Sequence, residues 1–387
     1  MDFTLSDEQR MIFEYGRNLA TDFGRDYWNK CAEEARFPTE MYRKVAADGF
    51  VGVMVPEAYG GAGLGMTEMA LFNESLAEQG MPLLSLVVGA TMGLSLIASF
   101  GTEEQKKKYL PPACAGETRF CFAITEPDAG TNSMRISTIA KPQADGTFRL
   151  NGTKVYITDA GESDFMVLVT RTTPLAEVKR KTDGFTLFIV PTRAKGIEMH
   201  PIPVGVKIPE TQYQIFFDNV ELTHDQVLGE VDRGFDILFH TLNPERILVG
   251  AICAGLGRHV LTRAVDYANE RTVFKGPIGA YQALQHPLAR AKTDIELAAL
   301  MTYKAAWLFD RGEQCGPEAN MAKLAGSEAC IRATDAALQC FGGNGFTKEY
   351  GMFDLFGVAR LMRTIPFNNE MIHNYIAEHV MGLPRSY

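Results

Sequence analysis

The stretch TLNPERILVGA, residues 241–251, holds a carboxylate whose position is compatible with two very different roles. Asn243 is a good helix N-cap and Pro244 suits the first helical position, so the pattern predicts that a helix begins here. Glu245 would then lie in the first turn, where a carboxylate stabilises the helix dipole. A carboxylate can also act as a general base when its pKa is raised. The local pattern favours the dipole role and leaves catalysis open.

Two further segments carry polar side chains that could face a ligand. The loop AITEPDAGTNS, residues 123–133, crowds hydroxyl groups around a flexible Ala-Gly pair and could offer donors to a polar ligand, but its composition alone favours an ordinary domain crossover. The strand KVYITDAG places an aromatic ring and a hydroxyl on one face, where core packing is the more common role. The side chains concerned are Thr125, Thr131 and Ser133 in the loop, and Tyr156 and Thr158 on the strand.

A glycine-rich segment, QCFGGNGF over residues 339–346, ends a long helical pattern. Glycine is a common helix terminator, so Gly342 and Gly343 need no ligand to explain them. The same glycines permit close approach by another backbone or a nucleotide. No strand precedes the segment, which excludes the dinucleotide fingerprint. Neither a metal-ligand set nor a Ser-His-Asp arrangement emerges elsewhere in the sequence.

Three compositional regions position these residues. Helical periodicity fills the first 120 residues, short β-branched and aromatic runs follow, and long helical patterns return after them. We therefore predict an α+β multidomain protein. Its domains are an N-terminal α-helical domain (1–120), a middle β domain that is a sandwich or barrel (121–231), and a C-terminal α-helical bundle (232–387).

Composition narrows the possible functions. The 387 residues are 46% hydrophobic and 22% charged, as in ordinary globular proteins, and the net charge of -9 argues against a nucleic-acid surface. Seven cysteines without a CxxC pair indicate reduced, mostly buried thiols. We see no leader sequence and no apolar run of membrane-spanning length, so we expect a cytoplasmic protein without membrane insertion.

The whole chain resembles the acyl-CoA dehydrogenases, flavoenzymes that desaturate acyl-CoA thioesters between the α and β carbons. The resemblance rests on segments in family order: VPEAYGGAG, FGTEEQKKKYLPPACAGE, AITEPDAGTNS, LNGTKVYIT, ERTVFKGPIGAYQALQHPLA and QCFGGNGFTKEYGMFDLFGVARL. It implies a helical domain, a β domain and a C-terminal four-helix bundle. It also implies fatty acid metabolism, a homotetramer, and electron-transfer flavoprotein as the electron acceptor.

The resemblance further implies FAD, held between the β domain, the bundle and a neighbouring subunit. Thr158 would hydrogen-bond flavin N5, and Tyr156 would pack on the isoalloxazine ring. Arg271, Phe274 and Gln282 would reach the FAD of the neighbouring subunit. The remaining residues assigned to the cofactor are Phe122, Ile124, Thr125, Thr131, Gln339, Gly342, Gly343 and Asn369.

The sequence departs from the family pattern at several places. Asn132 replaces a usual Asp, and Lys275 replaces a usual Gly. Many members carry the catalytic Glu near the C-terminus, where this chain has Phe367 in the segment TIPFNNEMI. An isovaleryl-CoA and long-chain subgroup places the base in a Glu-Arg pair at the start of the first bundle helix, which corresponds to Glu245 and Arg246. The resemblance thus favours Glu245 as the base.

The resemblance implies how such a base would work. Glu245 would remove the α proton while a hydride leaves the β carbon for flavin N5. Hydrogen bonds to the thioester carbonyl would stabilise the developing enolate, with the backbone N–H of Phe367 as one donor. Substrate contacts are expected from Ser133, Arg246 and Phe367. Three alternatives stay open: an enoyl-CoA reductase, a flavin oxidase, and a catalytically silent homologue that binds acyl-CoA.

Overall fold

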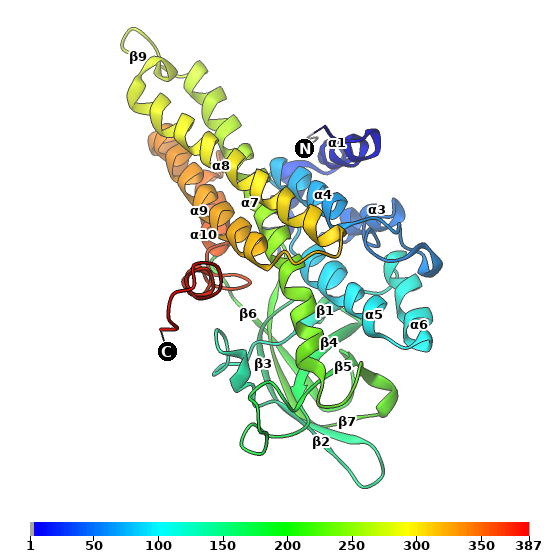
Figure 1. Ribbon diagram of the computed structural model, residues 1–387. Helices are drawn as coiled ribbons and strands as arrows, with labels where there is room; N and C mark the ends of the chain where they lie inside the picture. Colours follow the sequence, from blue (N-terminus) through cyan, green and yellow to red (C-terminus); the bar gives the residue numbers. More distant parts are fainter. Residues whose placement is uncertain (1–3, 387) are drawn as a thin grey trace.

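Three regions of different secondary structure make up the protein. The computed structural model describes residues 4–386, the side chain of residue 239 excepted. Figure 1 shows helices α1 to α6 on one side, the β sheet below them, and the long helices α7, α8 and α9 reaching away from the sheet. The order of helices, strands and helices agrees with the sequence prediction.

The N-terminal helices form around strong local signals. Ser6 caps the first helix through a reciprocal capping box with Gln9. The apolar run after Met81 is buried, but it forms a π-helix, η2 (Leu86–Leu94), before returning to α-helical geometry. The α-helices are α1 (Asp7–Asp22), α2 (Gly24–Glu33), α3 (Thr39–Ala47), α4 (Met66–Glu78), α5 (Ser95–Phe100) and α6 (Glu103–Cys114).

The middle strands form one eight-stranded sheet in the order β6-β7-β3-β2-β4-β5-β8, with β1 pairing in parallel with β4. Alternate residues of the central strands lie in two cores: Met166 and Leu168 within the curled sheet, and Val167 and Val169 against the helices. The strands are β1 (Phe120–Ala123), β2 (Ile139–Pro142), β3 (Phe148–Thr158), β4 (Phe165–Arg171), β5 (Phe185–Pro191), β6 (Ile197–Ile202), β7 (Gln212–Leu222) and β8 (Val227–Leu228).

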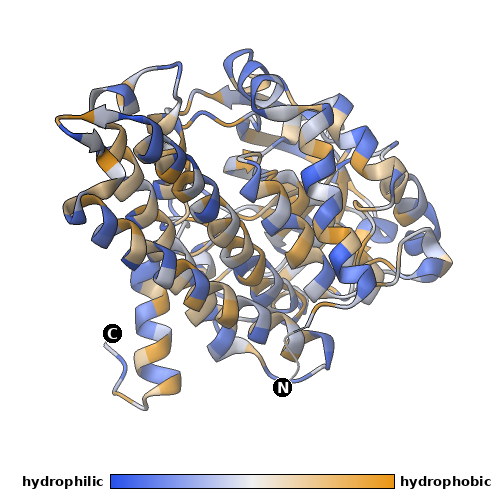
Figure 2. Ribbon diagram, turned by 90° about the horizontal axis from the view of Figure 1, so that it is seen from above, coloured by the Kyte–Doolittle hydropathy of each residue, from blue (hydrophilic) through white to orange (hydrophobic). Residues whose placement is uncertain are grey.

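The C-terminal helices pack as a bundle against α4. Figure 2 shows hydrophilic and hydrophobic residues intermixed along each of them, as expected for helices with one buried side. The elements are α7 (Gly234–Glu270), the hairpin strands β9 (Thr272–Val273) and β10 (Gly276–Pro277), α8 (Gln282–Asp310), α9 (Gly316–Phe341), α10 (Met352–Leu361) and α11 (Asn369–Tyr375). Helix α7 is long and apolar enough to cross a membrane, but 78% of its most apolar window is buried inside the protein, as in a core helix.

Glycines allow α7 to approach its neighbours closely. A Cβ atom on Gly255 would lie 2.1 Å from the carbonyl oxygen of Glu74 in α4. A Cβ on Gly326 of α9 would lie 3.2 Å from the Cα of Gly250. Helix α7 is therefore clamped between α4 and α9, and the side chains that it directs toward α9 lie in the interior of the protein.

Candidate active site

Glu245 lies about three turns into α7, not in the first turn of a helix. The predicted N-cap at Asn243 is wrong, because α7 begins at Gly234 and continues through Pro244. Proline lacks an N–H and tends to break a helix, which made a helix start the natural prediction. Here packing against α4 and α9 keeps the helix continuous. The dipole explanation for Glu245 also fails, because that effect is confined to the first turn.

The surroundings of Glu245 disfavour its ionised form. Burial raises the pKa of the carboxyl group to about 8, although Arg246 and Lys323 act in the opposite direction. The side chain keeps partial access to solvent, and no described residue donates a hydrogen bond to it. Glu370, the nearby alternative in the sequence, is exposed to solvent. Glu245 therefore has the environment that general bases and acids usually have.

Arg246 connects Glu245 to the C-terminal segment. Its guanidinium lies 5.4 Å from the centre of the Phe367 ring, within the range of a cation–π interaction. One of its terminal nitrogens donates to Asn243 Oδ1 at 3.4 Å. Its Nε is buried and has no hydrogen-bond partner among the described residues. The predicted pair of Arg246 and Phe367 thus comes together beside Glu245.

The loop of the β domain reaches the same place. Asn368, next to Phe367, donates from Nδ2 to Thr131 Oγ1 at 2.9 Å. Asn368 also caps α11 by accepting from the backbone N–H of Met371. Ser133 follows in a short 3-10 turn and is partly buried. The hydroxyl-rich loop and Glu245, far apart in sequence, are therefore joined through residues 367 and 368.

A buried ion pair that the sequence reasoning missed fixes this loop to strand β3. Lys154 Nζ lies 2.9 Å from Glu126 Oε1 and 2.7 Å from the carbonyl oxygen of Ile124, and both ionised side chains are buried. Glu126 also accepts from the N–H groups of Ser137 and Thr138. A single lysine within the strand run NGTKVYIT was the available signal, because an unpaired buried charge is very costly.

Strand β3 presents the predicted flavin residues beside the loop. Tyr156 has a φ of 58° at a bulge and is 61% exposed, so it does not pack in the core. The neighbouring Val155 N–H donates to the carbonyl oxygen of Thr125 at 2.9 Å. Thr158 Oγ1 donates to Gln212 Oε1 at 3.1 Å. Ile124 and Thr125 are partly exposed, whereas Phe122 is only 7% exposed and belongs to the core.

The remaining predicted cofactor residues gather at the opposite end of α7. Arg271, Phe341 and Asn344 line a cavity of about 390 Å³, so the hairpin after α7 and the glycine segment after α9 meet there. Gly342 ends α9 with a φ of 56°, and a Cβ on Gly342 or Gly343 would meet no atom within 4 Å. All six predicted residues of this group are exposed: Arg271, Phe274 (93%), Gln282, Gln339, Gly342 and Gly343.

The two groups lie far apart within one chain. Arg271 follows Glu245 by 26 residues along one helix, which corresponds to about 39 Å. Figure 1 likewise shows β9 at the end of the bundle that points away from the sheet. An extended dinucleotide does not span that length. The two predicted groups therefore cannot hold the same FAD molecule within one chain.

Asn369 differs from its predicted role as a cofactor contact. Its side chain is 2% exposed and is fully engaged with Lys323, Ser327 and Glu328. A buried amide with these partners organises the protein interior and is not available to a ligand. Lys323, which the sequence reasoning also missed, is a lone charge in the helical run NMAKLAGS.

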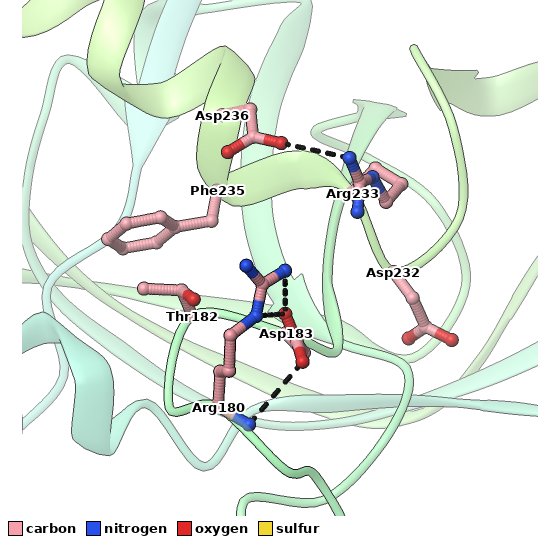
Figure 3. A pocket seen from close by; sticks show the side chains of 7 residues that line it. All are labelled: Arg180, Thr182, Asp183, Asp232, Arg233, Phe235 and Asp236. Atoms are coloured by element: carbon pink, nitrogen blue, oxygen red, sulfur yellow. Dashed lines mark hydrogen bonds and ion pairs between the residues drawn. The ribbon is translucent and has the colours of Figure 1, made fainter.

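A separate cavity of about 300 Å³ lies where α7 begins. Figure 3 shows its two arginines, each directed toward an aspartate: Arg180 Nη2 lies 2.8 Å from Asp183, and Arg233 Nη2 lies 3.5 Å from Asp236. Asp236 precedes Glu245 by nine residues, which corresponds to about 14 Å along α7. Both arginines among the described residues that line this cavity are thus paired with an aspartate.

Comparison with known protein families accounts for this arrangement. The family model for the N-terminal domain of acyl-CoA dehydrogenases matches residues 6–117. The models for the middle and C-terminal domains of the same family match residues 121–220 and 232–381. The chain belongs to the acyl-CoA dehydrogenase family. It is accordingly an oxidoreductase that acts on acyl-CoA, and its cofactor is FAD because this family is FAD-dependent.

Individual relatives span the whole chain. Acyl-CoA dehydrogenase FadE12 of Mycobacterium tuberculosis is 42% identical and covers 100% of this chain and 99% of its own length. A 3-(aryl)acrylate reductase of Clostridium sporogenes is 33% identical, and the match covers 94% of this chain and 97% of the reductase. The structure of a glutaryl-coenzyme A dehydrogenase–glutaryl-CoA complex superposes with a TM-score of 0.94 at 29% identity. The superposition covers 100% of this chain and 98% of the other.

The residues of this acyl-CoA dehydrogenase fit a flavin dinucleotide. An exposed tyrosine ring on β3 offers a surface for an aromatic ring system, and Thr125, Thr131 and Thr158 offer hydroxyl groups beside it. The open glycines after α9 and the exposed Arg271 offer space and charge for a nucleotide end. Bound FAD would supply a hydride acceptor, and the protein would supply position and proton transfer.

Proposed function

We propose that Glu245 is the base that removes the α proton of an acyl-CoA thioester in α,β-desaturation. The observation that carries this proposal is a carboxyl group with a pKa of about 8, beside Arg246 and close to the loop of the β domain. The matching hydride would leave the β carbon for flavin N5, so one proton and one hydride are removed together. Glu245 would accept the proton on a carboxylate oxygen.

Neighbouring groups would hold the substrate for this step. The backbone N–H of Phe367 would donate to the thioester oxygen, where negative charge develops as the α proton leaves. Ser133 and Arg246 would contact the CoA portion. The ring of Phe367, held beside Arg246, would exclude water from the reacting carbons. The hydrogen bond from Asn368 to Thr131 links this segment to the loop that carries Ser133.

The decisive experiment is anaerobic bleaching of the purified flavoenzyme by a panel of straight, branched, dicarboxylyl and aryl acyl-CoA thioesters. Wild-type protein should bleach with at least one member, and Glu245→Gln should keep FAD but bleach slower by a factor of about 10²–10⁴. Glu370→Gln is the matched control, because that carboxylate is exposed. Unchanged bleaching by Glu245→Gln would refute the assignment.

A second candidate is the reverse reaction, reduction of an enoyl thioester. A relative named 3-(aryl)acrylate reductase favours it, and so does a carboxyl group that stays mostly protonated at neutral pH. Glu245 would then donate its proton to the α carbon. The two directions respond oppositely to pH: the oxidative rate should rise through pH 8, whereas the reductive rate should fall. Rates measured in both directions with one substrate pair decide between them.

We further propose that two copies of the chain complete each FAD site, within a homotetramer. The separation of about 39 Å between Glu245 and Arg271 supports this, because each chain then offers half of two different sites. Co-expression of Glu245→Gln chains with Arg271→Glu chains tests it. Mixed oligomers should regain part of the activity that both parent variants lack. No recovery would mean that each site is built within one chain.

Electron-transfer flavoprotein is our proposed electron acceptor, and the cytoplasm our proposed location in a pathway of fatty acid metabolism. Reoxidation of the substrate-reduced enzyme distinguishes the first proposal from an oxidase. Fast reoxidation by added electron-transfer flavoprotein with slow reoxidation by air supports a dehydrogenase, whereas rapid peroxide formation in air supports an oxidase. The seven buried, free cysteines are compatible with a reducing compartment, and cell fractionation tests that location.

A further inference from the structure

Lys323 is a buried cation whose hydrogen-bond partners are neutral. Its side chain is fully buried on α9, facing α7 where the two backbones come close at Gly250 and Gly326. Its ammonium donates to Asn369 Oδ1 at 2.7 Å and to the carbonyl oxygen of Arg363 at 3.4 Å. No described carboxylate lies within ion-pair distance of it. A buried charge without a paired counter-ion is costly, so its retention calls for a reason.

The two acceptors of Lys323 are the two ends of one short segment. Arg363 begins it, and Asn369, the first residue of α11, ends it. The backbone N–H of Asn369 also donates to the Arg363 carbonyl at 3.1 Å, which closes the segment into a loop. The Asn369 amide is fixed further by Ser327 and Glu328 on α9. Lys323 therefore anchors residues 363–369 as a unit.

The loop of residues 363–369 carries Phe367 and Asn368, which contact Arg246 and the β domain. Phe367 lies under the guanidinium of Arg246, and Asn368 bonds to Thr131 of the β domain. Displacement of the loop would move the Phe367 N–H and release Arg246. The hydrogen bonds of Lys323 go to Arg363 and Asn369, so its effect on Phe367 and Asn368 is transmitted through the loop.

The charge of Lys323 also acts on Glu245 directly. Lys323 and Arg246 are the two cations that lower the pKa of Glu245 against the opposing effect of burial. Burial in turn lowers the pKa of Lys323 to about 8. The other ionisable groups that face Lys323 are Arg246 and Cys253 on α7, Glu328 on α9 and Glu370 on α11.

We propose that Lys323 is a positioning residue for Glu245, which anchors residues 363–369 through Asn369 and stabilises the carboxylate form of Glu245 through its charge. This inference rests on the proposed role of Glu245 as the base. Lys323, which lies on α9, would then affect catalysis without contacting the substrate.

The test compares three substitutions in the FAD-loaded protein. Lys323→Met removes charge and anchor, Lys323→Gln removes the charge but can still donate to Asn369, and Lys323→Arg keeps the charge. Lys304→Met is the control, because it removes an equal charge from an exposed site on α8, where solvent screens it. The carboxyl band of Glu245, identified by its loss in Glu245→Gln, is titrated by infrared difference spectroscopy beside the pH profile of kcat/KM.

The proposal expects the Glu245 titration to move to higher pH in Lys323→Met and Lys323→Gln, but not in Lys323→Arg or Lys304→Met. Each pH unit of movement would lower kcat/KM at pH 7 about tenfold. An additional rise in KM is expected for Lys323→Met alone. An unmoved Glu245 titration in a folded Lys323→Gln variant would overturn the electrostatic role.

The infrared titration also separates this inference from the proposed function. A shifted Glu245 titration without any change in the kinetic profile would mean that Lys323 acts on Glu245 but Glu245 is not the base. If Lys323→Met and Lys323→Gln both fail to fold, Asn369→Ala tests the anchor, since it leaves the ammonium in place. Wild-type kcat and KM in Asn369→Ala would then overturn the proposal.

Discussion

The pH dependence of turnover tests the active site most directly. Glu245 must be ionised to accept a proton, and its pKa lies near 8 because burial disfavours the charged form. With that pKa, about one-tenth of Glu245 is ionised at pH 7 and about nine-tenths at pH 9, so kcat/KM for desaturation should rise about tenfold between them. An ordinary exposed glutamate would be fully ionised throughout this range and would give no rise.

The assay is stopped-flow bleaching of the flavin under anaerobic conditions from pH 6 to pH 10, at substrate concentrations well below KM. A thioester α proton does not titrate in this range, so the rise of kcat/KM with pH reports on groups of the free enzyme. This rise is the ascending limb of the profile. Glu245→Gln should abolish the limb together with most of the rate, whereas Glu370→Gln should retain both. A pH-independent kcat/KM in the wild-type protein, or a limb that persists in Glu245→Gln, would refute the reasoning.

Three further substitutions probe the parts that hold the site. Arg246→Lys keeps the charge but removes the guanidinium that lies 5.4 Å from the centre of the Phe367 ring, so we expect KM to rise about fivefold, from about 1 kcal/mol of cation–π energy, with an unchanged pH dependence. Lys154→Met leaves Glu126 buried without its partner and should lower the free energy of urea unfolding by about 3–5 kcal/mol. Gly255→Ala places a Cβ against the α4 backbone, so α4 and α7 must separate, and thermal unfolding should show a loss of about 1–3 kcal/mol. Unchanged values in the respective measurements would contradict each expectation.

The sequence predicted the architecture well because its signals are local and strong. The change from helical to alternating periodicity near Phe120 and back near Gly234 marks the three regions. The capping box at Ser6 and the glycine end of α9 are likewise formed by a few neighbouring residues. The family resemblance implied the same order of domains, whereas the order of the strands within the sheet came only from the structure, because pairing between distant strands leaves no periodic signal.

The errors arose where tertiary packing overrides a local rule. Pro244 is a helix-start residue by propensity, yet it is buried and α7 continues through it. Asn369 is polar and lies in a family segment, but only the packed structure shows that its amide is used by Lys323 and Ser327. Buried lysines such as Lys154 look like surface residues in a sequence, because their partners lie far away along the chain.

In the proposed mechanism, the C-terminal segment supplies no base of its own and instead influences Glu245 on α7. Residues 363–369 contain no acidic group, but they hold the ring beside Arg246 and the amide that receives Lys323. Burial without these two cations would raise the pKa of Glu245 further, and a base that stays protonated at neutral pH cannot start desaturation. Excess positive charge would instead make the carboxylate too weak a base. The chemistry of Glu245 on α7 therefore depends on a segment more than a hundred residues away, which is why neither sequence region alone reveals it.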